Sequence, residues 1–158
     1  MASLKVFSNN VKGLRATFKR KKIFHFLNTL NCDFFCLQET HSDKDIEKEW
    51  SDEWCGKIAF SHGATNSLGV AILYKDKHKI LHTYADSKGR FVSVTIQIED
   101  KKILLIALYA PNIEREQKIF FNEIHSLILD AEYDELILTG DFNICLNNSL
   151  DKKGVIVW

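Results

Sequence analysis

The chain has 158 residues, 46% hydrophobic and 27% charged, and its 21 basic and 21 acidic side chains leave no net charge. This composition indicates a single globular domain with a core and excludes a disordered segment. No apolar run is long enough to span a bilayer, and residues 1–8 pass directly into a strand-like pattern, so we expect no membrane partner and no signal peptide.

The cysteines bear on the cellular compartment. They are irregularly spaced and form no Cys-x-x-Cys pair: Cys32, Cys36, Cys55 and Cys145. The six histidines likewise show no spacing typical of metal ligands. Irregular spacing argues against a disulfide framework and against a zinc site, so we expect reduced, mostly buried thiols in an intracellular protein.

The zero net charge conceals a basic region at the start of the chain. The first 32 residues contain seven basic side chains and no acidic one: Lys5, Lys12, Arg15, Lys19, Arg20, Lys21 and Lys22. Such a cluster can contact nucleic-acid phosphates even in a neutral protein. The alternative is a solvated helix face, which a charge cluster by itself favours.

Hydrophobic periodicity predicts the elements in chain order. Residues 4–10 read as a strand, and residues 17–30 as a helix with Thr17 as its N-cap. The apolar stripe of that helix is predicted at Ile23, Leu27 and Leu30. Residues 33–38 are continuously apolar and suit a buried strand. The acidic residues 43–54 read as a short helix or loop with Trp50 and Trp54 on one face.

Strands dominate the second half of the predicted fold. Further strands are expected at residues 56–60, 68–74, 79–84, 91–98, 103–109 and 134–139, and a helix at residues 114–130. The apolar face of that helix is predicted to comprise Phe120, Phe121, Ile124, Leu127 and Ile128. Residues 91–98 alternate apolar and polar side chains, which predicts a half-buried antiparallel strand. This order of elements indicates a layered α/β or α+β sandwich. Residues 154–158 begin another apolar run at which the chain stops, so the domain looks unfinished.

Polar side chains follow four of the apolar strands. They are Asn9 and Asn10, Glu39, Tyr109 and Asn112, and Asp141 and Asn143. Each alone is typical of a turn or of a satisfied core group. The last pair follows an apolar run that breaks at Gly140, and we expect a buried strand ending there in a glycine turn. If the four strand ends converge, their oxygen ligands suit Mg²⁺ or Mn²⁺ and a phosphate.

Five motifs occur in order along the chain: Ser8-Asn-Asn-Val-Lys-Gly-Leu14, Leu37-Gln-Glu-Thr40, Gly69-Val-Ala-Ile-Leu73, Tyr109-Ala-Pro-Asn112 and Gly140-Asp-Phe-Asn143. Together they resemble the endonuclease/exonuclease/phosphatase superfamily. More narrowly, they resemble the apurinic/apyrimidinic-endonuclease-like domain of non-LTR (LINE-type) retrotransposons. Ser61-His-Gly63 and Asp86-Ser-Lys-Gly-Arg90 resemble that subgroup as well.

The resemblance implies a four-layer α/β sandwich and a Mg²⁺-dependent DNA endonuclease, with Mn²⁺ as the alternative metal and no small-molecule cofactor. Such an enzyme nicks a target strand to prime reverse transcription, which implies a nuclear location. The resemblance assigns Glu39 and Asn10 to the metal, Asp141 to the attacking water, Asn143 to the developing charge and Tyr109 to the scissile phosphate. It also assigns Asn112 and Arg15 to nucleic-acid contacts.

Two departures from the family pattern limit this interpretation. Lys12 stands where many of these nucleases place Asp or Asn, and a lysine there either repels a cation or binds phosphate. A late Ser-Asp-His motif, which belongs to the family's catalytic machinery, does not follow Asn143. We therefore expect residues 1–158 to form one C-terminally truncated domain, inactive or weakly active, whose open sheet edges favour self-association. Two alternatives stay open: a non-catalytic nucleic-acid-binding remnant, and a phosphatase or phosphodiesterase of the same fold.

Overall fold

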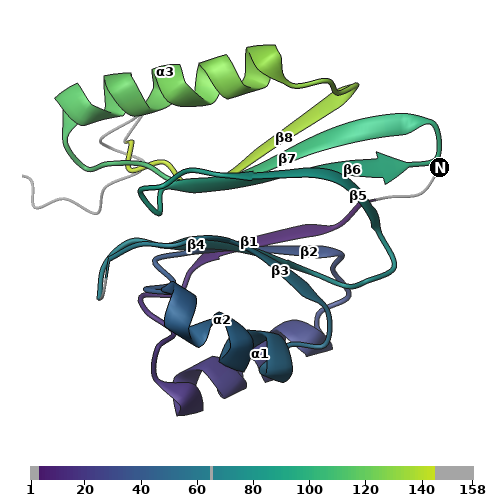
Figure 1. Ribbon diagram of the computed structural model, residues 1–158, viewed down its shortest axis with the longest axis vertical. Helices are drawn as coiled ribbons and strands as arrows, with labels where there is room; N and C mark the ends of the chain where they lie inside the picture. The colour runs from purple at the N-terminus through teal and green to yellow at the C-terminus, as the bar shows by residue number, and fades with distance from the viewer. Residues whose placement is uncertain (1–3, 65, 145–158) are drawn as a thin grey trace, which may run out of the picture.

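The computed structural model describes residues 4–64 and 66–144. Its elements, drawn in Figure 1, follow the predicted order of strands and helices closely. They are β1 (Val6–Asn10), α1 (Thr17–Thr29), β2 (Phe34–Gln38), the 3₁₀ helix η1 (Lys44–Ile46), α2 (Glu47–Glu53), β3 (Lys57–Ser61), β4 (Val70–Tyr74), β5 (Lys79–Ala85), β6 (Phe91–Ile98), β7 (Lys101–Tyr109), α3 (Glu114–Asp130) and β8 (Glu135–Asp141).

The strands form two four-stranded sheets. The first has the order β1-β2-β4-β3, and the second the order β5-β6-β7-β8. Strands β1 and β2 are parallel, as are β7 and β8, whereas the other pairs are antiparallel. Figure 1 shows the sheets stacked face to face, with α1 and α2 outside the first sheet and α3 outside the second. The predicted four-layer sandwich is confirmed.

Three apolar clusters hold these layers together. The cluster between the sheets includes Phe34 and Cys36 of β2 together with Leu105 of β7. Their neighbours Phe35 and Leu37 point to the other face of β2, where they pack with α1 and α2. A third cluster joins the second sheet to α3. Strand β2 is therefore buried on both faces, which explains its continuously apolar sequence.

Strand β6 is more deeply buried than its alternating sequence predicts. Ser93 and Thr95, expected on a solvent-facing side, are only 3% and 6% exposed. Both line a small cavity together with Leu127 of α3. The prediction of a half-buried strand was wrong because the alternation shows which face is polar but not that a helix covers it.

Strand β8 differs from its prediction in two ways. Among the described strands it lies at the edge of its sheet rather than inside it, and Leu136 is 39% exposed. The strand also continues through Gly140 to Asp141 instead of turning at the glycine. Gly140 has φ +138°, and a Cβ atom there would lie 2.0 Å from the carbonyl oxygen of Leu108. The glycine is therefore required by the close approach of β7, and not by a turn.

Helix α1 buries a face that only partly matches the predicted one, since Leu27 is buried and Leu30 is partly buried. Ala16, not Thr17, occupies the N-cap position, and no side chain caps the helix. The buried residues are Arg20, Phe24 and Leu27, whereas Ile23 is only partly buried. A charged residue, Arg20, is thus buried beside the apolar residues of the helix, and it needs partners inside the protein.

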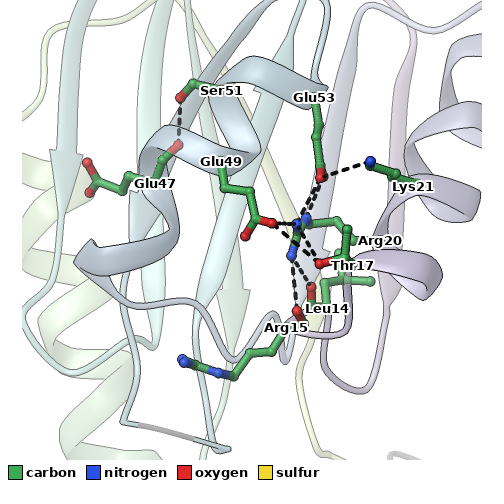
Figure 2. A network of polar contacts seen from close by, with 9 residues as sticks. All are labelled: Leu14, Arg15, Thr17, Arg20, Lys21, Glu47, Glu49, Ser51 and Glu53. Atoms are coloured by element: carbon green, nitrogen blue, oxygen red, sulfur yellow. Dashed lines mark hydrogen bonds and ion pairs between the residues drawn. The ribbon is translucent and has the colours of Figure 1, made fainter.

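Figure 2 shows how Arg20 is satisfied. Its Nε and Nη2 atoms donate to the two carboxylate oxygens of Glu53 at 2.6 and 2.9 Å, and Nη2 lies 3.0 Å from Glu49. Its Nη1 atom donates to the carbonyl oxygens of Leu14 and Arg15 at 3.2 and 3.1 Å. The hydrogen bonds from Arg20 lower the pKa of the Glu53 carboxyl. This network ties α1 to α2 and to the loop after β1, and it removes Arg20 from the basic surface.

Other expectations are met in part. Trp50 and Trp54 are both buried in the cluster beneath α1 and α2, as predicted. Of the thiols, Cys36 is buried and Cys32 half-buried, but Cys55 is exposed, so the prediction of mostly buried cysteines holds only partly. Cys145 and the apolar run at 154–158 lie outside the described residues. Within residues 4–64 and 66–144, no helix is both long and apolar enough to cross a membrane.

Candidate active site

The ends of four strands meet at one end of the sandwich. Strand β1 ends at Asn10, Glu39 follows β2, β7 ends at Tyr109 and β8 ends at Asp141. The Nδ2 atom of Asn10 donates to Glu39 Oε1 at 2.7 Å and to Asp141 Oδ2 at 3.1 Å. One carboxamide thus joins a carboxylate of the first sheet to a carboxylate of the second. The convergence that the polar strand ends suggested is present.

A cleft opens beside this junction. It has a volume of about 690 Å³ and is lined by the end of β1, by Gln38 and by residues 139–144. Asn10 and Asp141 both line it, and Glu39 directly follows Gln38. Clefts of this size with a few polar side chains are where small ligands bind in proteins.

Glu39 is held in a strained backbone conformation. Its φ is +53°, and His41, two residues on, has φ +55°. The loop after β1 supports this segment from one side, since Gly13 N–H donates to the Glu39 carbonyl at 2.6 Å. Gly69 supports it from the other, as its carbonyl accepts from Thr40 N–H at 3.0 Å. Left-handed backbone at residues other than glycine costs energy, and it is concentrated at functional sites.

Asp141 and Asn143 form a compact unit at the end of β8. The backbone N–H of Asn143 donates to Asp141 Oδ1 at 3.1 Å, and its side-chain Nδ2 donates to the carbonyl of Ala110 at 2.7 Å. The Asp141 carbonyl in turn accepts from Ala110 N–H at 2.8 Å. Asp141 therefore keeps one oxygen toward Asn10, while Asn143 braces the strand end against the segment after β7.

Tyr109 faces the same junction. Burial raises the pKa of its phenol, and a hydrogen bond to the Glu39 carboxylate raises it further. The phenol therefore stays protonated at neutral pH and can donate a hydrogen bond. Arg90 lies over the tyrosine ring, with its guanidinium carbon 5.3 Å from the ring centroid. Sequence reasoning placed Arg90 in a motif without giving it a role, and the contact with Tyr109 is what assigns it to this site.

Two of the seven predicted residues form no hydrogen bond with the junction in the described part of the chain. Arg15 forms an ion pair with Asp43, and Asn112 is exposed in the loop between β7 and α3. Among the described residues, no hydrogen bond joins either of them to Asn10, Glu39 or Asp141. Their contacts with nucleic acid stay a prediction.

The oxygen ligands at the junction fit a small hard cation. No group of three or more His, Cys, Asp or Glu side chains gathers in the part of the chain that is described. Mg²⁺ needs only one or two carboxylates, because water and substrate phosphates complete its coordination. Glu39 and Asp141 supply such a pair. The Asn10 amide nitrogen faces both carboxylates, and its oxygen accepts from Lys12 N–H at 3.1 Å, so in this arrangement Asn10 orients the carboxylates.

Comparison with known proteins identifies relatives of the whole described chain. The Endonuclease/Exonuclease/phosphatase family matches residues 3–152. The transposon TX1 uncharacterized 149 kDa protein of Xenopus laevis is 29% identical over 148 residues, covering 92% of this chain and 11% of that protein. An exodeoxyribonuclease of Bacillus subtilis is 23% identical, covering 95% of this chain and 62% of the enzyme.

A solved structure with the same fold is also known. The endonuclease domain of TRAS1, a telomere-specific non-LTR retrotransposon, superimposes with a TM-score of 0.66 at 16% identity, covering 90% of this chain and 62% of that domain. At this identity the likeness shows the shared fold. The chain thus spans less than two thirds of the length of each of these three relatives. With the family match covering nearly all of its length, the chain belongs to the endonuclease/exonuclease/phosphatase family.

Proposed function

We propose that this chain carries the junction of Glu39, Asn10 and Asp141 as part of a divalent-metal-dependent site that hydrolyses DNA phosphodiester bonds. The observation that carries the proposal is the Asn10 amide that joins the two carboxylates at 2.7 and 3.1 Å. An exodeoxyribonuclease and a retrotransposon endonuclease domain among the similar proteins support DNA as the substrate. More specifically, we propose that this protein nicks DNA in the nucleus, as an endonuclease of the retrotransposon type.

Each side chain at the junction would have a separate role in phosphodiester hydrolysis. Glu39 and Asp141 would hold Mg²⁺ or Mn²⁺, which neutralises charge on a phosphoryl oxygen when bound. The Asn10 amide donates to both carboxylates and so holds them in a fixed position relative to each other. The phenol of Tyr109 is protonated at neutral pH, like that of any tyrosine, and donates to a non-bridging phosphate oxygen.

Asp141 also has the position of a general base. Its Oδ1 accepts from the Asn143 N–H and its Oδ2 from the Asn10 amide. Each oxygen keeps a further lone pair, so one can contact the metal while the other orients and deprotonates an attacking water. Asn143 braces this carboxylate and, through a change of its side-chain rotamer, can donate to the charge that develops on phosphate. Lys12 is exposed beside the site and is suited to bind phosphate rather than metal.

The experiment is Mg²⁺-dependent nicking of supercoiled plasmid. We expect slow nicking by the 158-residue protein that Glu39→Ala and Asp141→Ala each abolish. Glu49→Ala is the matched control, because Glu49 is an exposed carboxylate on α2 outside the site. Nicking that survives both site substitutions would refute the assignment. Rapid nicking that both substitutions abolish would confirm the site and overturn the expectation of weak activity.

A non-catalytic nucleic-acid-binding role is the competing proposal, and it depends on the basic region. The structure weakens it, because Arg20 is buried and Arg15 pairs with Asp43. Lys19 donates to the carbonyl oxygens of Val11 and Lys12. A metal-independent role predicts DNA binding that falls steeply with salt and does not respond to Mg²⁺, which a titration at two salt concentrations measures.

A further inference from the structure

His62, in the motif Ser61-His-Gly63, has no role in the chemistry proposed above but makes two polar contacts. It directly follows β3, and its Nδ1 atom lies 3.1 Å from Ser42 Oγ. Its Nε2 atom lies 2.5 Å from the carboxylate of Glu47, the first residue of α2. The imidazole ring also stacks on Phe60, with the ring centroids 4.9 Å apart. His62 therefore connects β3 and α2 to the loop that follows β2.

The Ser42 hydroxyl extends this connection toward Glu39. Ser42 and Thr40 are both fully buried, and their hydroxyl oxygens lie 3.0 Å apart. The backbone N–H of Ser42 also donates to Thr40 Oγ1 at 3.4 Å. A buried hydroxyl that lacks a partner destabilises a protein, so each of these groups depends on the next. The contacts run without a break from α2 to the residue beside Glu39.

The Glu47 carboxylate fixes the direction of every hydrogen bond in this series. An ionised carboxylate only accepts, so His62 Nε2–H donates to it. In the neutral imidazole Nδ1 is then an acceptor, and the Ser42 hydroxyl donates to it. The Ser42 oxygen is left to accept from the Thr40 hydroxyl. The Thr40 side chain is thus held in one orientation by groups on a neighbouring helix and strand.

Thr40 is the centre of the strained turn that presents Glu39. Left-handed residues flank it on both sides, with φ +53° at Glu39 and φ +55° at His41. The N–H groups of Thr40 and His41 donate to the carbonyls of Gly69 and Leu68 at 3.0 and 2.9 Å. A Cβ atom on Gly69 would lie 2.4 Å from Thr40 Oγ1, so this hydroxyl fits closely against the Gly69 backbone. A turn of this kind persists only where its surroundings fix it from several sides.

We propose that His62 is a positioning residue for the Glu39 carboxylate, and that it acts through the hydroxyls of Ser42 and Thr40. The inference rests on the proposed function, which makes Glu39 a metal ligand. Ser42 is fully buried and cannot attack a substrate, so the Ser42–His62 pair is not a second hydrolytic site. Groups that lie behind a metal ligand fix its orientation, and their loss lowers the affinity for the metal.

Two substitutions of His62 separate its polar contacts from its packing. His62→Phe keeps a ring that can stack on Phe60 but removes both nitrogen atoms. His62→Asn loses the ring but places an amide oxygen close to the position of Nδ1, where it can accept from Ser42. Ser42→Ala deletes the hydroxyl itself, and Ser126→Ala is the matched control, because Ser126 is exposed on α3 in the other helical layer.

Hydrogen exchange of the backbone amides, followed by NMR in EDTA, measures the effect on the turn. In His62→Phe and in Ser42→Ala we expect the amides of Thr40 and His41 to exchange at least fivefold faster, with the amides of α3 unchanged. His62→Asn and Ser126→Ala should behave like the wild type. The double variant should exchange no faster than Ser42→Ala alone, because both substitutions break the same connection. Faster exchange in His62→Asn than in His62→Phe would show that the ring acts by packing, and would overturn the proposal.

A Mn²⁺ titration of the same variants connects the turn to the metal. We expect His62→Phe to weaken Mn²⁺ binding at least threefold and His62→Asn to bind Mn²⁺ like the wild type. Equal Mn²⁺ affinity in the wild type and His62→Phe would overturn the positioning role. A wild-type protein that binds no Mn²⁺ would instead refute the proposed function. Because the exchange measurement needs no metal, it would still decide whether His62 holds the turn.

Discussion

Removing the partner of the buried Arg20 tests whether the network in Figure 2 holds the first helical layer in place. The Arg20 side chain is fully buried, the Glu53 side chain is 12% exposed and the Glu49 side chain is 48% exposed. Breaking a buried ion pair by deleting one partner costs about 3–5 kcal/mol, because it leaves an uncompensated charge. Glu49 and two carbonyl oxygens still contact the guanidinium in Glu53→Ala, so we expect a loss of about 3 kcal/mol, near the lower limit.

Glu49→Ala is the matched control on the same helix. Exposed ion pairs contribute no more than about 1 kcal/mol, so this variant should lose far less stability. Urea unfolding followed by circular dichroism measures both, and about 3 kcal/mol corresponds to a midpoint lowered by roughly 1–2 M. Equal, small losses for Glu53→Ala and Glu49→Ala would show that Arg20 does not depend on Glu53, and the reasoning from burial would then fail.

Three further predictions concern stability and the site. Gly140→Ala should lower the free energy of unfolding by at least about 2 kcal/mol, measured in urea, because its Cβ would lie 2.0 Å from the Leu108 carbonyl oxygen; an unchanged midpoint would contradict this. Hydrogen bonds from Arg20 hold the pKa of the Glu53 carboxyl below its usual value, so the ionised carboxylate stabilises the fold at any pH above that usual value. The free energy of unfolding should therefore decline as the pH falls below about 4. This decline should be smaller in Glu53→Gln, and thermal melts from pH 3 to 7 measure it. Tyr109→Phe should slow nicking by about 10²-fold without changing its pH profile near neutrality, because the raised pKa keeps the phenol protonated there; a shifted profile would contradict this.

The periodic elements could be predicted because their signal is local. Helix α3 spans Glu114–Asp130, the range predicted from its apolar face, and the strands agree to within a few residues. The polar strand ends also indicated residues that converge in the structure, since Asn10, Glu39, Tyr109 and Asp141 lie together. Their convergence was an assumption, because it depends on parallel pairing between strands that are distant in the sequence.

Three of the features that were missed depend on such distant contacts. Arg20 read as a surface cation because its partner Glu53 is 33 residues away. Gly140 read as a turn because the backbone that crowds it belongs to Leu108 of a neighbouring strand. Arg90 had no role until the structure placed it over Tyr109. Local propensity carries no information about these neighbours, and each error follows from that.

Binding of Mn²⁺ to the metal-free protein tests the proposed metal site most directly. Electron paramagnetic resonance of free Mn²⁺ in a titration gives the affinity without requiring catalysis. We expect one site in the wild type, weakened at least tenfold by Glu39→Gln and by Asp141→Asn and unchanged by Glu49→Gln, because only the first two carboxylates meet at the Asn10 amide. Equal Mn²⁺ affinity in the wild type, Glu39→Gln and Asp141→Asn would contradict the assignment of this junction as a metal-dependent nuclease site.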